Sequence, residues 1–244
     1  MMRVMILGGT SGLGLALAQY YLQHGEQVMV CGRDLQRLPT DMRKQYATLS
    51  CHQLDIADKA GMSQIVNDFG ENGIDLLIVT AGVYCNTRHH QLDEAATMRM
   101  LQTNVSGLSH AFELVSAKML HQRSGHMVAV SSVAGLLHDY PGASLYSATK
   151  RSVLSLCDTY RMALKPFSIP VTAIVPGYID TAKLRALNQG DTSKKPFLFS
   201  EAQAVELIVA AIDARQEMLI FPWQMRWLIA VLNKLPRWLM SLRS

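Results

Sequence analysis

The sequence has only four cysteines, Cys31, Cys51, Cys85 and Cys157, and none of them forms a C-x-x-C pair. Scattered thiols of this kind argue against a disulfide scaffold or a cysteine-ligated metal site, and they favour a reducing, cytoplasmic setting. The chain also lacks a Lys/Arg-rich run and its net charge is a mild +4, so we expect no nucleic-acid partner. The amino-terminal apolar run is too short for a signal peptide.

What the sequence does contain is a regular alternation of short apolar runs and segments with helical spacing. Apolar runs are typical of parallel strands covered by helices on both faces. We therefore predict a doubly wound α/β domain of the Rossmann type over residues 1–220, with a parallel sheet of about seven strands, and a C-terminal extension over 221–244. The predicted strands are residues 4–7, 27–31, 47–54, 74–79, 126–130, 171–175 and 217–220.

Three glycines, Gly8, Gly12 and Gly14, lie between the first predicted strand and the first helix. In this setting Gly8 allows a tight turn, Gly12 lets the backbone approach a phosphate, and Gly14 lets the helix pack closely on the sheet. The N-terminus of the helix then offers unpaired N–H groups to a pyrophosphate. A glycine-rich turn without a ligand is the alternative, but the strand before it and the helix after it favour a dinucleotide.

The end of the second predicted strand bears on which dinucleotide binds. A site for NAD usually places an acidic side chain there for the ribose 2′-hydroxyl. Here Gly32 takes that place and Arg33 follows, whose guanidinium suits a 2′-phosphate. We therefore expect NADP(H) rather than NAD(H). The alternative is that Arg33 is a solvated loop residue and that Asp34 caps the next helix.

A second set of residues suits acid–base chemistry. Tyr146 and Lys150 are four positions apart, so they share one face of a helix. An ammonium near a phenol favours the phenolate and lowers the tyrosine pKa from about 10, which makes Tyr146 a candidate general acid and base. Ser132, at the end of the fifth predicted strand, is placed to donate a hydrogen bond to the same substrate oxygen. A surface Tyr–Lys pair is the alternative for this pattern alone.

Together these residues resemble the short-chain dehydrogenase/reductase family over about residues 3–215. The stretch LGGTSGLG is similar to the family's cofactor turn, and Thr80-Ala81-Gly82 is similar to its N-A-G segment. Leu54-Asp55-Ile56 resembles the segment that contacts the adenine ring. Asn104 matches the asparagine of the catalytic set, and Pro176-Gly177 with Thr181 resembles the loop that closes over the nicotinamide.

The resemblance implies a single-domain NADP(H)-dependent oxidoreductase that transfers hydride between the nicotinamide and a carbonyl or alcohol substrate. Tyr146 would exchange the proton, Ser132 would polarise the substrate oxygen and Lys150 would bind the nicotinamide ribose. Asn104 would hold a water linked to Lys150. The implied cofactor contacts are Gly8, Thr10, Ser11, Gly12, Leu13, Gly14, Arg33, Asp55, Ile56, Ala81, Gly82, Tyr146, Lys150, Pro176, Gly177, Ile179 and Thr181.

Several positions depart from the family pattern. Leu7 stands where threonine is usual, and Thr80 replaces an asparagine, which affects one backbone hydrogen bond in the central sheet. Ser132 and Tyr146 are fourteen positions apart, one more than in many members, which implies a small insertion at 138–140. Ser131 is a rival for the role of Ser132, although the pattern SSVAG places that role on the second serine.

Two other functional classes compete with an NADP(H)-dependent oxidoreductase. A nucleotide-sugar epimerase or dehydratase usually has the spacing G-x-x-G-x-x-G and a larger substrate domain, and this chain has neither feature. A non-catalytic NADP-sensing or interaction module tends to lose the tyrosine or the lysine, whereas Tyr146 and Lys150 are both present. Catalysis is therefore the leading hypothesis.

The C-terminal extension departs from the family's usual ending. On a helical wheel its basic and polar side chains gather on one side and its leucines on the other, and no acidic residue follows Glu217. Pro236 predicts a break into two short helices. Such a helix either packs over the substrate cleft or a second subunit, or it makes a peripheral membrane contact through 223–244 without spanning the bilayer.

The substrate site is defined less sharply by the sequence. A polar segment at 188–195 suits an active-site lid, and both versions of the extension fit an apolar or lipid-like substrate. His89 and His90 lack placed carboxylate or cysteine partners, so we expect no metal. The resemblance implies a homodimer or homotetramer. The predicted pocket residues are Val83, Tyr84, Cys85, His138, Tyr140 and Tyr178.

Overall fold

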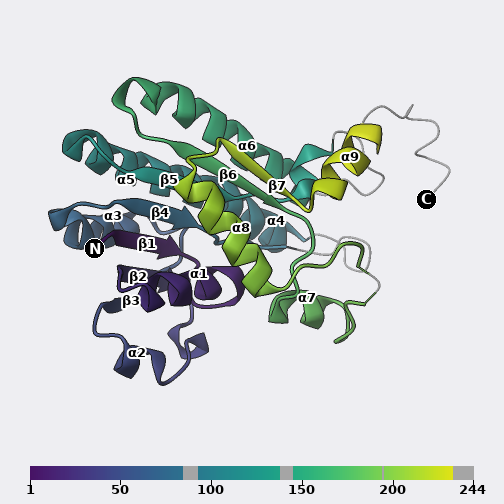
Figure 1. Cartoon of the computed structure of the whole chain (residues 1–244), viewed down its shortest axis with the longest axis horizontal. Helices are drawn as coiled ribbons and strands as arrows, with labels where there is room; N and C mark the ends of the chain where they lie inside the picture. The colour runs from purple at the N-terminus through teal and green to yellow at the C-terminus, as the bar shows by residue number, and fades with distance from the viewer. Residues whose placement is uncertain (85–92, 138–144, 194, 233–244) are drawn as a thin grey trace.

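The computed structural model describes residues 1–84, 93–137, 145–193 and 195–232. Seven strands form one parallel sheet in the order β3-β2-β1-β4-β5-β6-β7, which confirms the predicted doubly wound fold (Figure 1). The strands are β1 (Arg3–Leu7), β2 (Gln27–Gly32), β3 (Leu49–Gln53), β4 (Leu76–Val79), β5 (His126–Val130), β6 (Val171–Pro176) and β7 (Met218–Phe221).

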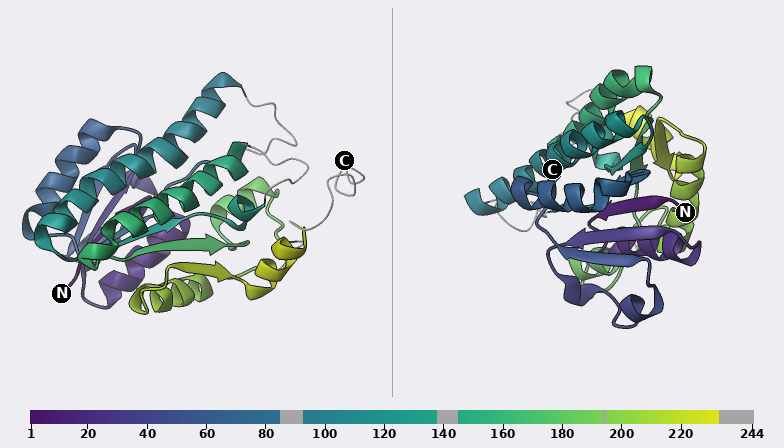
Figure 2. Two further views of the ribbon diagram at one scale, coloured as in Figure 1. Left: turned by 90° about the horizontal axis from the view of Figure 1, so that it is seen from above. Right: turned by 90° about the vertical axis from the view of Figure 1, so that its left-hand side faces the viewer.

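Helices cover both faces of the sheet (Figure 2). On one face lie α1 (Gly12–Gln23) and α8 (Glu201–Asp213), and on the other lie α3 (Lys59–Phe69), α5 (Gly107–Gln122) and α6 (Leu145–Leu164). The shorter elements are α2 (Met42–Gln45), α4 (Glu94–Leu101), α7 (Ala182–Leu187), α9 (Trp223–Leu232), the 3₁₀ turns η1 (Leu35–Arg37), η2 (Gly70–Asn72), η4 (Val133–Leu136) and η5 (Lys165–Phe167), and the π turn η3 (Gln102–Ser106).

The alternation of side chains along the strands divides the core into two halves. In β1, Met5 and Leu7 pack into the cluster under α3, α5 and α6, whereas Val4 and Ile6 pack into the cluster under α1 and α8. All four side chains are buried. A strand with both faces buried is mostly apolar, which is why the apolar runs predicted the sheet so well.

The strand boundaries differ from the prediction by one or two residues, and one difference has a clear cause. The strand predicted at 74–79 begins at Leu76, because the backbone of Ile74 pairs with a side chain instead of a strand. The Ile74 N–H donates to Gln122 Oε1 at 3.0 Å, and its carbonyl accepts from Gln122 Nε2 at 2.6 Å. The carboxyl ends of the strands lie at one edge of the sheet, where α7 and α9 also lie (Figure 1).

Candidate active site

The four predicted catalytic residues come from three elements that meet at the carboxyl edge of the sheet. Ser132 follows β5 and begins η4, Asn104 lies in η3, and both Tyr146 and Lys150 lie in the first turns of α6. Tyr146 and Lys150 share one face of the helix, as their spacing predicts. The Lys150 Nζ atom lies 5.9 Å from the centroid of the Tyr146 ring.

The structure gives the two neighbouring serines different surroundings. Ser131 is buried, and its Oγ donates a 2.7 Å hydrogen bond to the Lys150 carbonyl, which ties β5 to α6. Ser132 hydrogen-bonds to Tyr146, and its Oγ also accepts from the Ala134 N–H at 3.2 Å. The geometry therefore places Ser132, and not Ser131, beside the tyrosine hydroxyl.

Lys150 is a buried ammonium with no acidic partner among the residues that the structure describes. Its Nζ donates to the Val130 carbonyl at 2.9 Å. Burial, and then the positive charge of Lys183, lower the Lys150 pKa to about 8. The side chain therefore holds its proton weakly, in a place where an anionic group would stabilise it.

The expected lowering of the Tyr146 pKa does not hold in this arrangement. Burial raises the Tyr146 pKa to about 12, the hydrogen bond from Ser132 lowers it, and the nearby Tyr84 phenol raises it. The physical reason is that Lys150 donates to a backbone carbonyl, so the loss of solvent around the phenol outweighs the neighbouring charge. The Tyr84 ring packs edge-on against Tyr146, with centroids 4.9 Å apart, so one predicted pocket residue lies at the site.

Asn104 uses its side chain to join two parts of the site. Its Oδ1 accepts from the Val83 N–H at 2.8 Å, and its Nδ2 donates to the Val83 carbonyl at 2.9 Å and to Thr149 Oγ1 at 3.0 Å. Both amide hydrogens are therefore bonded to protein atoms. Asn104 sits in a π turn, a feature that often marks functional sites and that the sequence did not predict. The side chain positions the end of β4 against α6.

The glycine turn is shaped by contacts between β1 and β4. Gly8 has a φ of +94°, and a Cβ there would lie 2.5 Å from the Ala81 nitrogen, so only glycine fits. Gly14 lets α1 approach the turn, since a Cβ there would lie 2.3 Å from the Gly8 carbonyl oxygen. Thr80, which replaces the usual asparagine, donates from Oγ1 to the carbonyls of Leu7 and Gly8 at 3.2 and 3.1 Å. The threonine therefore retains a bond to this turn.

Gly12, by contrast, is less crowded than Gly8 and Gly14, because an added Cβ would make only ordinary van der Waals contacts. Its φ is +52°, and the nearest atom to an added Cβ would be the Thr181 methyl carbon, at 3.7 Å. Ser11, at the start of α1, makes no side-chain hydrogen bond to the first turn. The backbone N–H groups of that turn are thus not capped by Ser11 and are available to an anion.

At the end of β2, the space above Gly32 is filled by a neighbouring side chain. A Cβ at Gly32 would lie 2.5 Å from Thr10 Oγ1 and 2.6 Å from Thr10 Cγ2, so no acidic side chain fits at this position. Asp34 caps η1 by accepting from the Gln36 N–H at 2.9 Å, and it pairs with Arg37 at 3.2 Å. Arg33 is exposed and makes no ion pair with another described residue.

Three further predicted cofactor contacts, Ala81, Asp55 and Ile56, have different surroundings. Ala81 joins β4 to β1 through its N–H, which donates to the Leu7 carbonyl at 3.0 Å. Asp55 is exposed beyond β3 and accepts from the Ala57 N–H at 3.0 Å. The side chain of Ile56 belongs to the core, because it is buried and packs directly against Gly107.

The loop after β6 covers the glycine turn. The Gly177 N–H donates to the Phe221 carbonyl at 2.7 Å, and Ile179 forms an isolated bridge with Phe199. Thr181 caps α7 by accepting from the Leu184 N–H at 3.1 Å, and its methyl group faces Gly12. The predicted lid segment is tied to this loop, since Thr192 donates to Asp180 at 3.2 Å.

The sequence analysis missed Lys183, which the structure brings to the site. Its Nζ donates to the Gly82 carbonyl at 3.0 Å, although the two residues are 101 positions apart. A lysine in the first turn of a short helix gives no signal in the sequence, because such residues are usually solvated. Only the path of the loop after β6 places it here.

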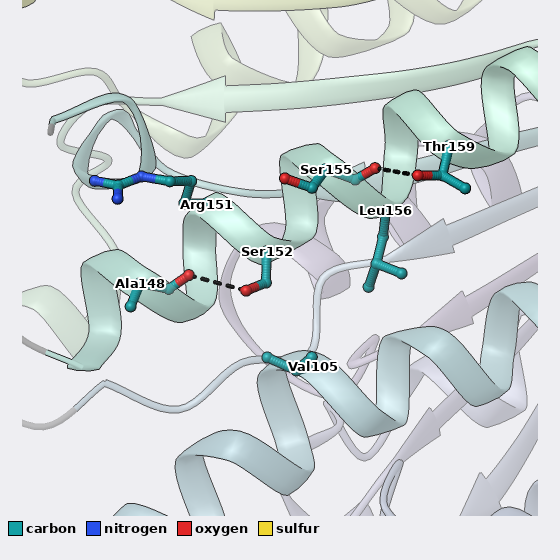
Figure 3. Close-up of a pocket in the computed structure, with 7 residues that line it drawn as sticks. All are labelled: Val105, Ala148, Arg151, Ser152, Ser155, Leu156 and Thr159. Atoms are coloured by element: carbon teal, nitrogen blue, oxygen red, sulfur yellow. Dashed lines mark hydrogen bonds between the residues drawn. The ribbon is translucent and has the colours of Figure 1, made fainter.

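A separate hollow lies on the outer side of α6, against η3 (Figure 3). Its volume is about 490 Å³, and none of the four catalytic candidates lines it. Two of its hydroxyls bond within the helix, Ser152 to the Ala148 carbonyl at 3.1 Å and Thr159 to the Ser155 carbonyl at 2.9 Å. The hollow is thus distinct from the catalytic residues on the inner side of α6.

The described part of the C-terminal extension is the helix α9. Met225 and Ile229 are buried, and α9 lies beside η4 and β7, so one side of the helix is part of the domain core. Trp223 and Trp227 are each 67% exposed and Val231 is 57% exposed on another side. Among the described residues, no helix is long and apolar enough to cross a bilayer.

Some predicted features fall on residues that the structure does not describe. They are Cys85, the His89-His90 pair, the insertion at 138–140 with His138 and Tyr140, and the break at Pro236. In the described ranges, no group of three His, Cys, Asp or Glu residues is arranged to hold a metal ion.

Comparisons with known proteins identify the family. The family model for short chain dehydrogenase matches residues 2–192. An "Uncharacterized oxidoreductase" of Myxococcus xanthus (strain DK1622) is 30% identical over 226 residues, which cover 91% of this chain and 87% of that protein. Dehydrogenase/reductase SDR family member 7B of Xenopus laevis is 30% identical over 189 residues, which cover 73% of this chain and 58% of that protein.

Solved structures share the fold. The closed form of serine dehydrogenase complexed with NADP⁺ has a TM-score of 0.81 at 24% identity and covers 90% of this chain and 94% of its own. Serine dehydrogenase from Escherichia coli has a TM-score of 0.67 at 28% identity and covers 72% of this chain and 83% of its own.

Proposed function

This chain belongs to the short-chain dehydrogenase family and is an oxidoreductase that acts on CH–OH and C=O groups, and we propose that it uses NADP(H) with an apolar carbonyl or alcohol substrate. The observation that carries the proposal is the convergence of Ser132, Tyr146 and Lys150 at the sheet edge that also holds the glycine turn. The positive φ of Gly12 and the first turn of α1, which Ser11 does not cap, fit a pyrophosphate.

Bound NADP(H) would supply or accept the hydride, and the side chains would handle the oxygen and its proton. Tyr146 gives its proton to the carbonyl oxygen during reduction and takes it back during oxidation. A pKa of about 12 keeps the phenol protonated at neutral pH, which suits the donor role. Ser132 donates a hydrogen bond to the same oxygen, and the Lys150 ammonium stabilises the phenolate that forms. Asn104 holds Val83 and α6 in place.

The preference for NADP(H) is proposed from the end of β2. Thr10 excludes a carboxylate at position 32, and Arg33 follows as an exposed cation, so the local charge favours a 2′-phosphate. Titration of purified protein with NADPH and NADH tests this directly. We expect NADPH to bind at least about tenfold more tightly, as one charge-assisted contact would give.

Two variants sharpen the titration. Arg33→Ala should remove the preference for NADPH, whereas Lys165→Ala, which removes an exposed cation at the amino-terminal side of β6, should leave it unchanged. Tighter binding of NADH by the wild type would contradict the cofactor assignment. Binding of neither cofactor would favour a non-catalytic interaction module on the same fold.

The partner copy is proposed to bind through α5 and α6. The hollow against η3 lies on the outer side of α6 and is lined partly by apolar side chains, which favours contact with a second copy of the chain there (Figure 3). Light scattering after size exclusion should report a dimer or tetramer. Ser155→Arg, in the hollow, should reduce the mass, and Ser193→Arg should not. A monomeric wild type would contradict the proposal.

A peripheral membrane contact is proposed for the exposed side of α9. Two tryptophans one turn apart, on a chain with no acidic residue after Glu217, suit the interface of an anionic bilayer. The double change Trp223→Ser/Trp227→Ser should abolish pelleting with anionic liposomes, whereas Met162→Ser, at another exposed apolar residue, should not. Failure of the wild type to pellet would rule the contact out.

A further inference from the structure

Lys183 connects the loop after β6 to the opposite side of the cofactor turn. It lies two residues after Thr181, whose methyl group faces Gly12, and its Nζ donates to the Gly82 carbonyl beyond β4 at 3.0 Å. The ammonium therefore lies between the two segments that the family resemblance assigns to the cofactor. One of its three N–H groups is used in this bond, and two remain.

A second ammonium lies on the same glycine. Lys150 Nζ would be 3.3 Å from a Cβ at Gly82, so Lys150 and Lys183 both lie close to this residue. Burial and then the charges of Arg33 and Arg37 lower the Lys183 pKa, and the charge of Lys183 in turn lowers the Lys150 pKa. The charges of Arg33 and Arg37 thus act on Lys183, and the charge of Lys183 acts on Lys150.

The acidic residues nearby do not neutralise Lys150 or Lys183, although Asp34 pairs with Arg37 at 3.2 Å. Among the described residues, no carboxylate forms an ion pair with Lys150 or Lys183. Asp180 is bound to Arg185, through two bonds of 2.8 and 2.7 Å, and to Thr192. Glu201 faces the glycine turn, with Oε1 3.9 Å from the position of a Cβ at Gly12, and burial raises its pKa. An anionic ligand would relieve this concentration of positive charge.

We propose that Lys183 binds the pyrophosphate of the dinucleotide and so holds α7 against the end of β4. Its place beside Gly82 and Lys150, with Thr181 over Gly12, is that of the pyrophosphate and the adjoining ribose, while Arg33 lies at the end of β2. The pyrophosphate is common to NADPH and NADH. Lys183 therefore supports binding of both cofactors, whereas Arg33 distinguishes between them. This inference rests on the proposed function.

The test measures the Kd of NADPH and of NADH for four full-length proteins. Lys183→Met should weaken both cofactors by the same factor, roughly tenfold, because it removes one charge-assisted contact that both share. Lys183→Arg, which keeps the charge, should recover most of the affinity. Lys165→Met, at the amino-terminal edge of the sheet and away from the cofactor turn, should bind like the wild type. The thermal midpoint without cofactor, recorded for each, verifies that Lys183→Met is folded.

Each outcome decides the question. Equal weakening of NADPH and NADH by Lys183→Met, with rescue by Lys183→Arg, supports the inference. Weakening of NADPH alone would assign Lys183 to the 2′-phosphate and overturn it. Unchanged affinities in a folded Lys183→Met protein would also overturn it, while leaving the proposed function intact. A wild type that binds neither cofactor would instead reject the proposed function, and the inference with it.

Discussion

The two sides of the proposed active site are built in different ways. On the side of β5 and α6, each polar group is fixed by a partner: Ser131 bonds to the Lys150 carbonyl, Lys150 Nζ bonds to Val130, and Asn104 bonds to Val83. On the side of β2, Arg33 is an exposed side chain, and its surroundings are defined by the close packing of the glycine turn.

The difference follows from what each side has to do. Proton transfer requires a donor held within hydrogen-bond distance of the reacting oxygen, so Ser131, Asn104 and Lys150, which support Tyr146, are buried and hydrogen-bonded. Recognition of a phosphate by a guanidinium tolerates a flexible side chain, because charge acts over a longer range. There the decisive feature is steric, since Thr10 leaves no room for the carboxylate that would repel the phosphate.

The largest effect is expected from Tyr146→Phe, on the side of β5 and α6, which we call the fixed side. Removal of the hydroxyl takes away the group that exchanges the proton, so kcat should fall by about 10²–10⁴. The Kd of NADPH should change little, because the ring and its contact with Tyr84 remain. Steady-state rates and a cofactor titration on the same preparation measure both. A variant that keeps its rate would remove Tyr146 from the chemistry.

The next effect is expected from Gly32→Asp, on the side of β2, where Thr10 crowds this position. The new Cβ would meet Thr10 at 2.5 Å, so the single variant should lose about 1–3 kcal/mol of stability and bind both cofactors poorly. Adding Thr10→Ala removes the two closest atoms and should restore folding with a preference for NADH. Urea unfolding and paired titrations test this. A stable single variant that still prefers NADPH would show that Thr10 does not control the position.

The sequence predicted the strands and the convergence of the catalytic residues better than the electrostatic details of the site. The apolar runs gave all seven strands, and the pattern was clearest for the five inner strands, which are buried on both faces. The order of the motifs brought Ser132, Tyr146 and Lys150 together. The predicted direction of the shift in the Tyr146 pKa was wrong, because the shift depends on how deeply the phenol is buried and on which atom Lys150 contacts.

Two other features could not be read from the pattern at all. The obstruction above Gly32 arises from Thr10, a residue of another loop, and only the packed structure reveals it. Lys183 reaches Gly82 across 101 positions of sequence, through a path set by the loop after β6. Contacts of this kind depend on tertiary packing and have no local signature.

A smaller effect is expected from the two serines of the fixed side, which should separate catalysis from stability. Ser132→Ala should lower kcat by about 10²-fold with little change in stability, since it removes a donor to the substrate oxygen. Ser131→Ala should leave the chemistry in place and cost about 1–2 kcal/mol of stability, because it leaves the buried Lys150 carbonyl without this donor. Rates and urea unfolding of both variants make the comparison. The reverse pattern would exchange the two roles.

The last effect is a pH dependence of stability from the buried ammonium of Lys150. Burial lowers the Lys150 pKa from 10.5 to about 8, so between these values the unfolded chain binds a proton that the folded chain does not. Stability from this group therefore rises with pH between about 8 and 10.5. Cys31 and Cys157, with pKa values raised from 9.0 to about 12, act in the opposite direction above pH 9.

The contribution of Lys150 is isolated by comparison with Lys150→Met. Because both proteins contain the two buried cysteines, their effect cancels in the difference between the two free energies of unfolding. We expect the wild type to gain stability relative to Lys150→Met as the pH rises from 8 to 10, measured by urea unfolding without cofactor. Lys165→Met, which removes an exposed ammonium, should run parallel to the wild type. A curve for Lys150→Met that also runs parallel to the wild type would mean that Lys150 keeps its ordinary pKa. The side of β5 and α6 would then not be desolvated at Lys150, and the contrast with the exposed Arg33 on the side of β2 would be lost.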